Sequence, residues 1–157
     1  MRKTVIDPSY GQSMEELKGS GVSEPVFSAG VIVDSGELRL VYLSGRVATD
    51  DAAPTAEGRQ RVVGTGDVKE QTRQIIRNLR STLRQAGGDL DDIVRVRVYV
   101  VAPMTRAAFG QIHEARAEFF RKEHYPASTL VVVSGLVRAD ALIEMDADAV
   151  IGRSDDR

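Results

Sequence analysis

A change of hydrophobic period between residues 67 and 101 constrains the fold of this 157-residue chain more than any other feature. Apolar residues first recur at helical spacing from Val68 to Ala86, which predicts one apolar stripe along a helix. Gly87-Gly88 ends this helix, because glycine readily adopts the left-handed conformation of a C-cap. Ile93–Val101 then alternates between apolar and polar or aromatic residues, with Val94, Val96, Val98 and Val100 on one face, which indicates a strand with one buried face.

The segments on either side extend this pattern. Asp67, with Glu70 three residues later, forms an N-cap signature for the helix. A turn sequence at 34–37 separates two β-rich runs and predicts a hairpin, and 49–66 is rich in Asp, Ala, Pro, Gly and Thr and predicts a loop. Residues 1–22 lack clear periodicity and predict a flexible lead-in. We expect strands at 27–33, 38–44, 93–101, 129–136 and 141–151, an extended piece at 60–63, a helical turn at 14–18, and a second helix at 105–122 with Phe109, Ile112, Phe119 and Phe120 inside.

Two helices set among several strands indicate an α+β two-layer sandwich, with the helices on one face of the sheet. The last two strands carry more apolar positions than one face needs, and alternate faces of a strand cannot both turn to the helices. We therefore expect the second face to be buried in an oligomer. These positions are Val131, Val133, Ile143, Met145, Ala147, Ala149 and Ile151.

Composition excludes several classes of protein. The chain has no cysteine, so it has neither disulfides nor thiolate chemistry, and its net charge of −2 does not favour general nucleic-acid affinity. No run approaches the roughly 18 apolar residues of a membrane span. Residues 1–8 include basic side chains with no apolar run after them, so no secretory signal is expected. These features predict a cytoplasmic protein that does not bind membranes.

Two groups of residues are candidates for chemistry. Ser44-Gly45-Arg46 closes a strand, where glycine allows a ligand to approach the backbone, although a plain strand end or bulge explains it equally well. Glu144, Asp146 and Asp148 share one face of the last strand and could serve in proton transfer or bind a divalent cation. We favour a proton-transfer group over a metal, and either a solvated face or cross-strand pairs with arginines for the two aspartates.

Other polar residues favour structural roles. Arg73, Arg77, Arg80 and Arg84 line one helix face and could contact phosphates, but a solvated surface is the default. His113 and His124 show no triad-like setting. No phosphate-binding glycine loop and no nucleophile elbow is present.

Four segments, in the same order and spacing, resemble the Rid (YjgF, endoribonuclease L-PSP) family over Pro25–Ile151. They are VKEQTRQIIRNLRSTLRQAGGDLDDIVRVRVYV at 68–100, AEFFRKEHYPAS at 117–128, Ser44-Gly45, and LIEMDADAV at 142–150. The resemblance divides the chain into an extension at 1–24, a Rid-like domain at 25–151 and a polar tail at 152–157. It implies a chorismate-mutase-like fold and a homotrimer with a central β-barrel and three clefts between subunits.

The resemblance also implies an activity. Well-known members hydrolyse enamines and imines, such as 2-aminoacrylate, to ketoacids and ammonia without a cofactor or metal. An arginine after Pro-Ala holds the substrate carboxylate, the Ser-Gly segment assists through its backbone, and a strand glutamate positions water. Glu144 matches that glutamate, and Ser44 and Gly45 match the strand end.

This sequence departs from the family pattern at three positions. Ser128 stands where the arginine is expected, Val26 follows Pro25 where tyrosine is frequent, and Arg46 replaces glutamine. Serine cannot reproduce the planar, bidentate grip of a guanidinium on a carboxylate. Arg46 or Arg97 is therefore a hypothetical substitute cation, with Ser128 and Gly45 in contact with the substrate.

Three functions follow from these expectations. The first is hydrolysis of an imine or enamine, not necessarily 2-aminoacrylate, with Glu144 orienting water. The second is a non-catalytic trimer that binds a small metabolite, which the loss of the arginine favours. The third is RNA cleavage or inhibition of translation, against which the acidic charge balance weighs.

Overall fold

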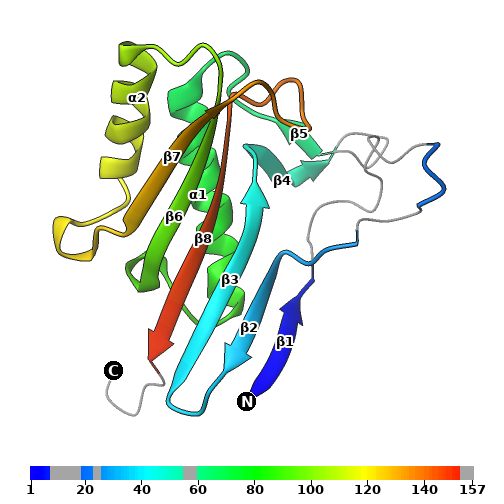
Figure 1. Cartoon of the computed structure of the whole chain (residues 1–157), viewed down its shortest axis with the longest axis vertical. Coiled ribbons are helices and arrows are strands. Elements are labelled where there is room, and N and C mark those ends of the chain that lie inside the picture. Colours follow the sequence, from blue (N-terminus) through cyan, green and yellow to red (C-terminus); the bar gives the residue numbers. More distant parts are fainter. Residues whose placement is uncertain (8–18, 23–25, 55–59, 153–157) are drawn as a thin grey trace.

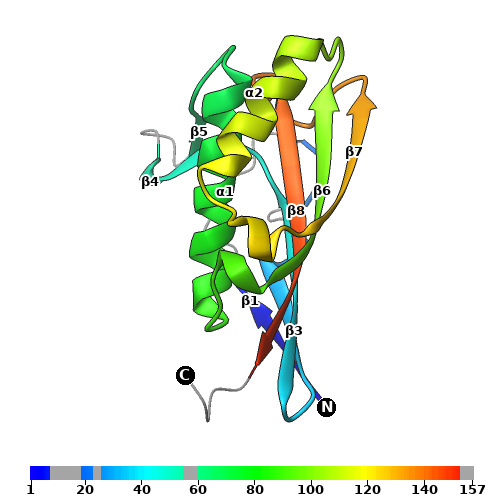
Figure 2. The ribbon, with the colours of Figure 1, turned by 90° about the vertical axis from the view of Figure 1, so that its left-hand side faces the viewer.

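The computed structural model of the chain describes residues 1–7, 19–22, 26–54 and 60–152. A six-stranded sheet is covered on one face by two α-helices, and a small two-stranded sheet lies beside it (Figures 1 and 2). The main sheet consists of β1 (Arg2–Ile6), β2 (Gly30–Asp34), β3 (Leu38–Arg46), β6 (Ile93–Val101), β7 (Ala127–Val133) and β8 (Ile143–Gly152). The other elements are β4 (Thr49–Pro54), β5 (Gln60–Val62), α1 (Val68–Gln85), α2 (Arg106–Ala117) and single 3-10 turns at Leu90–Asp92 and Lys122–His124.

The strands of the main sheet run in the order β1-β2-β3-β8-β6-β7. All neighbours are antiparallel except β6 and β7, which are parallel and joined through α2. This crossover places α2 beside α1 on one side of the sheet, and Figure 2 shows both helices there. The predicted α+β two-layer sandwich is therefore confirmed for the single chain.

Helix α1 forms as its sequence predicts. The Asp67 side chain accepts a hydrogen bond from the Glu70 backbone N–H at 3.0 Å, which caps the first turn. Ile75 and Leu79 on the apolar stripe are almost fully buried against the sheet. Gly87 has a φ of 85° and stops the helix, a conformation that other residues rarely adopt.

The inner face of β8 corrects our argument for oligomerisation. Ile143, Met145, Ala147, Ala149 and Ile151 all turn towards the helices and are at most 4% exposed. The opposite face of this strand carries its carboxylates instead. Five of the seven apolar positions counted in the sequence are thus buried inside one chain, whereas Val131 remains 43% exposed, and an oligomer has to be argued from such exposed residues.

Five local expectations were wrong. Residues 2–6, expected to be irregular, form the edge strand β1, and residues 49–54 form β4 rather than a loop. Helix α2 ends at Ala117, and Phe109 remains 45% exposed. Val94 is 49% exposed rather than inward, because the register of β6 against β8 shifts between Ile93 and Arg95. The helical turn expected at 14–18 lies outside the described residues, and no described helix is long and apolar enough to span a membrane.

Candidate functional site

Polar side chains follow β6 and β8 on the sheet face away from the helices. The Arg97 guanidinium contacts Asp146 through Nε, at 2.8 Å, and Asp148 through Nη1 and Nη2, at 2.7 and 2.9 Å. The Tyr99 hydroxyl donates to Asp146 at 3.2 Å. Both aspartates are therefore in cross-strand pairs, one of the two arrangements that the sequence favoured. Arg97 already has two carboxylate partners, so the structure lends no support to its binding a ligand carboxylate.

Glu144 differs from these neighbours on the same face. The structure shows no ion pair for it among the described residues, and the side chain is half-buried. Burial raises the pKa of the Glu144 carboxyl above its ordinary value, and the negative charge of Asp146 raises it further. A carboxyl group with a raised pKa exchanges protons closer to neutral pH, which suits an acid–base role.

Gly45 lies directly beneath the Glu144 carboxylate. A Cβ atom added at Gly45 would lie 2.1 Å from Glu144 Oε1, far inside any normal contact. Position 45 therefore accepts only glycine while Glu144 keeps this position. The structure thus brings together two of the predicted site residues, one from the end of β3 and one from β8.

A β-bulge explains why Gly45, rather than Arg46, lies on the same face as Glu144. Leu43 pairs with Ala147 and Arg46 with Met145, so three steps along β3 match two along β8. The extra residue turns the Arg46 side chain towards the helices, where it is 3% exposed. Arg46 and Glu144 lie on opposite faces of the sheet, and the hypothesis that Arg46 supplies charge beside Glu144 finds no support in this chain.

The two remaining candidates before and within β3 have different surroundings. The Ser44 hydroxyl donates to the Ser28 carbonyl at 2.6 Å, and the Ser44 backbone N–H donates to the Ala29 carbonyl at 3.0 Å. Ser44 thereby fixes the bulged end of β3 to the segment before β2. Val26 is 91% exposed and lies outside this arrangement in the single chain.

Ser128 lies in a separate hollow at the start of β7. Its partner across the sheet is Val96, which faces the helices, so the Ser128 side chain points to the helix face. Arg116 on α2 donates through Nη1 to the Ser128 hydroxyl at 3.1 Å. The hollow has a volume of about 270 Å³. Its lining is His113, Arg116, Ala117, Phe120, Tyr125, Pro126 and Ser128.

Arg116 did not emerge from the sequence as a site residue. It precedes Ser128 by twelve positions, and its immediate sequence neighbours do not distinguish it from the other arginines of the chain. Only the tertiary arrangement of α2 and the start of β7 brings the two side chains together. A helical projection that places Arg116 next to the buried Ile112 and Ala115 is the one signal that could have singled it out.

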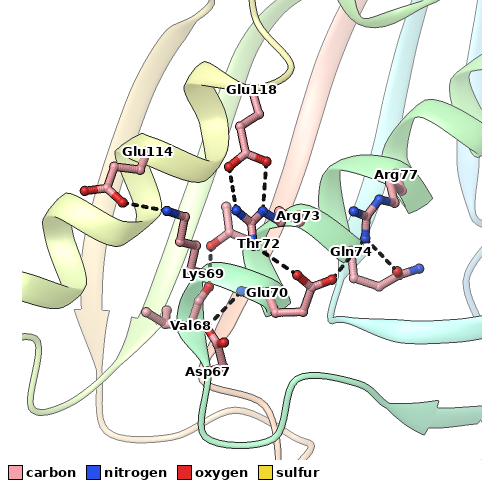
Figure 3. A network of polar contacts seen from close by, with 10 residues as sticks. All are labelled: Asp67, Val68, Lys69, Glu70, Thr72, Arg73, Gln74, Arg77, Glu114 and Glu118. Atoms are coloured by element: carbon pink, nitrogen blue, oxygen red, sulfur yellow. Dashed lines mark hydrogen bonds and ion pairs between the residues drawn. The ribbon is translucent and has the colours of Figure 1, made fainter.

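The row of arginines on α1 is neutralised by carboxylates. Arg73 pairs with Glu118 of α2 at 2.6 Å and with Glu70 at 3.2 Å, and Arg77 pairs with Glu70 at 3.1 Å (Figure 3). Arg80 and Arg84 both pair with one further acid, Asp89. The row therefore connects α1 to its surroundings, and its positive charge is largely compensated.

We expect Asp89→Asn to reduce the free energy of unfolding by about 1 kcal/mol at pH 7, because these solvent-screened pairs are individually weak. The hydrogen bond from Arg80 lowers the pKa of Asp89 to about 2, with the Leu90 N–H and Arg84 assisting. A lowered pKa in the folded state stabilises the fold above pH 3.8, and this contribution disappears as the pH falls towards 2. Urea unfolding should show the same difference at pH 7 and pH 5 and a smaller one at pH 3. A difference that does not change with pH would contradict this account.

The histidines and the acidic face show no metal-site geometry. His113 packs its ring against Phe109 at a centroid distance of 4.4 Å, and His124 ends the 3-10 turn before β7. Burial lowers the pKa of His113, and the charge of Arg116 lowers it further. Within the described residues, no three His, Asp or Glu side chains are placed to hold one metal ion.

Comparison with known proteins agrees with this arrangement. The family model described as endoribonuclease L-PSP matches residues 24–151. A RutC family protein of Pyrococcus abyssi is 42% identical over 109 residues, which cover 69% of this chain and 76% of that protein. The fold places the chain among the α+β proteins of the L-PSP type. The chain belongs to the YjgF (Rid, endoribonuclease L-PSP) family.

Solved structures of similar fold extend over nearly the whole chain. The Rid-family protein YyfA of Yersinia pestis aligns with a TM-score of 0.70 at 25% identity and covers 96% of this chain and all of its own. TdcF of E. coli, solved with bound serine, aligns with a TM-score of 0.67 at 24% identity and covers 95% of this chain and 99% of its own. This second likeness concerns the fold alone.

Proposed function

We propose that this chain hydrolyses the C=N bond of a small imine, formed directly or from an enamine, to a carbonyl compound and ammonia. The observation that carries the proposal is the Glu144 carboxylate, half-buried and held against Gly45 at the bulged end of β3. A carboxylate whose pKa is raised by burial can accept a proton from water and return it. Membership of the YjgF family supports this choice of reaction.

The reaction needs water alone as co-reactant. Glu144 accepts a proton from water while the water oxygen bonds to the imine carbon, and the electrons of the C=N π bond move to nitrogen. Glu144 then gives this proton to the nitrogen. The hydroxyl proton passes through the same carboxylate to that nitrogen, the C–N bond breaks to release ammonia, and the C=O bond forms. The products are ketone or ketoacid and ammonia. The backbone at Gly45 is close enough to line the water site.

The proposal includes assembly into a homotrimer, with the sheets around a central barrel and a ligand cleft between subunits. Glu144 and the hollow at Ser128 lie on opposite sheet faces in one chain, so a ligand that contacts both has to lie between two chains. The outer sheet face also exposes Tyr42 and Val131 to 46% and 43%. Contact between copies would remove this apolar surface from water. A solution mass three times that of the chain is expected.

A second candidate function is binding of a small metabolite without turnover. The observation in its favour is Ser128, because position 128 lacks the guanidinium that the family pattern provides. RNA cleavage has less support, since the arginine row on α1 is paired with carboxylates.

The experiment that tests the proposal is ketoacid and ammonia release from 2-aminoacrylate and 2-iminobutanoate, generated in place by a dehydratase. We expect release clearly faster than spontaneous hydrolysis, in proportion to the concentration of added protein. A rate equal to the spontaneous one for both compounds would contradict hydrolysis of these substrates and favour the binding role. Light scattering after size exclusion measures the mass, and a monomer would contradict the inter-subunit cleft.

A further inference from the structure

The hollow at the start of β7 contains an arginine, Arg116, at a position that the resemblance to the family did not single out. Ser128 occupies the expected arginine position, yet the Arg116 guanidinium lies 3.1 Å from its hydroxyl. We infer that Arg116, delivered from α2, binds the carboxylate of the ligand in this chain, with Ser128 as its hydrogen-bonding partner. The inference rests on the proposed function for the identity of the ligand.

The charge of Arg116 is what makes this hollow suitable for an anion. Among the residues that the structure describes, no carboxylate pairs with Arg116, whereas Arg73, Arg97 and Arg121 all have acidic partners. Burial lowers the pKa of Arg116, but a guanidinium stays protonated in proteins. A half-buried cation without a counter-ion is poorly solvated, and a bound carboxylate would compensate it.

The other residues of the hollow fit a small carboxylic acid. The lining contains no acidic side chain that would repel an anion. The lowered pKa of His113 keeps its ring neutral near pH 7, so it can accept or donate a hydrogen bond without competing for the carboxylate. Phe120 and Tyr125 offer ring surfaces to a hydrocarbon body. At about 270 Å³ the hollow fits a metabolite of a few carbon atoms, below the usual drug-sized range.

In the proposed cleft, Arg116 and Glu144 come from different subunits and have different roles. Arg116 lies on the helix face of one chain, and Glu144 lies on the outer face. One subunit therefore holds the ligand carboxylate, and its neighbour positions the water. Arg116 and the missing strand arginine differ in the element that carries the cation but supply the same planar pair of N–H donors.

The first test measures binding separately from turnover. The full-length protein is titrated with 2-oxobutanoate, a stable ketoacid, and with its neutral amide, by calorimetry. We expect wild type to prefer the acid and Arg116→Ala to weaken acid binding by about 10- to 100-fold, the usual range for a charge-assisted hydrogen bond. Arg116→Ala/Ser128→Arg should restore binding, because it returns a guanidinium to the same hollow. Arg121→Ala, which removes an exposed arginine paired with Asp91, is the matched control and should bind as wild type.

Equal binding of acid and amide by wild type, or equal acid binding by wild type and Arg116→Ala, would overturn the inference. So would the absence of acid binding by wild type at millimolar concentration. Circular dichroism melting of each variant separates lost binding from lost folding, and the rescue by Ser128→Arg does so again. If the acid binds through Arg116 but no imine is hydrolysed, the proposed reaction fails and the binding site stands. If hydrolysis proceeds with an unchanged KM in Arg116→Ala, the reaction stands and Arg116 is only structural.

A mixing experiment tests the division between subunits. Arg116→Ala and Glu144→Gln chains are co-expressed and assayed for imine hydrolysis. In randomly mixed rings, a cleft is intact when one chain keeps Arg116 and its neighbour keeps Glu144, which gives about one quarter of wild-type activity (one half times one half). Activity no higher than that of the two separate variants would contradict a cleft shared in this way.

Discussion

Glu144→Gln should reduce the kcat of imine hydrolysis by about 10²- to 10⁴-fold, the usual contribution of a positioned general acid–base group. Glutamine keeps the size and the polar contacts of glutamate but cannot accept a proton from water. KM should change little, because the ligand carboxylate is held elsewhere. Steady-state kinetics with dehydratase-generated 2-iminobutanoate measures both constants. A kcat within twofold of wild type would remove Glu144 from the mechanism.

The pH profile provides the control for this prediction. Burial, and then the charge of Asp146, raise the pKa of Glu144, so wild-type kcat should fall as the pH drops through that raised value. Asp146→Asn removes one cause and should move this acid limb to lower pH, while Glu144→Gln should abolish it. A carboxyl group whose pKa is raised in the folded state lowers the stability of the fold when it is ionised. Urea unfolding of Glu144→Gln at pH 7 should therefore show equal or higher stability, which excludes unfolding as the cause of its low activity.

The elements that sequence predicted well have long, regular periods. Helix α1 shows its apolar stripe over five turns and has an N-cap at Asp67 and a glycine stop at Gly87, so its bounds follow closely. The strand Ile93–Val101 has the predicted bounds for a similar reason. Edge strand β1 was missed because four of its five residues are exposed, and it pairs only with β2. A strand that buries only Ile6 has no periodic hydrophobic signal to detect.

Bulges set the limit for predicting the site. Strict alternation along β3 would place Leu43 and Gly45 on one face and Arg46 on the other. The extra residue near Gly45 reverses this and leaves glycine, rather than arginine, beside Glu144. The same kind of shift at Ile93 turns Val94 outward. Register against a distant strand decides such positions, and β8 is a hundred residues away from β3.

Tertiary contacts also decide whether an arginine can bind a ligand. Arg97 had an expected role as a cation for a ligand, but the aspartates of β8 neutralise it across the sheet. Arg116 is distinguished in the sequence only by its place next to buried positions in a helical projection, yet it is the arginine that lies beside Ser128. Residue types revealed that a positive charge was missing from position 128. They could not reveal which element restores it, because that depends on where α2 lies relative to the start of β7.

Gly45→Ala should lower kcat about 100-fold, since displacing a catalytic group by roughly 1 Å can cost that much. The added methyl group would lie 2.1 Å from Glu144 Oε1, so the carboxylate has to move. Gly152→Ala, whose methyl group would meet no atom within 4 Å, is the matched control and should keep full activity. The effect acts through Glu144, so adding Gly45→Ala to Glu144→Gln should cause almost no further loss. Independent losses in the double variant would mean that Gly45 serves the ligand itself rather than the position of the carboxylate.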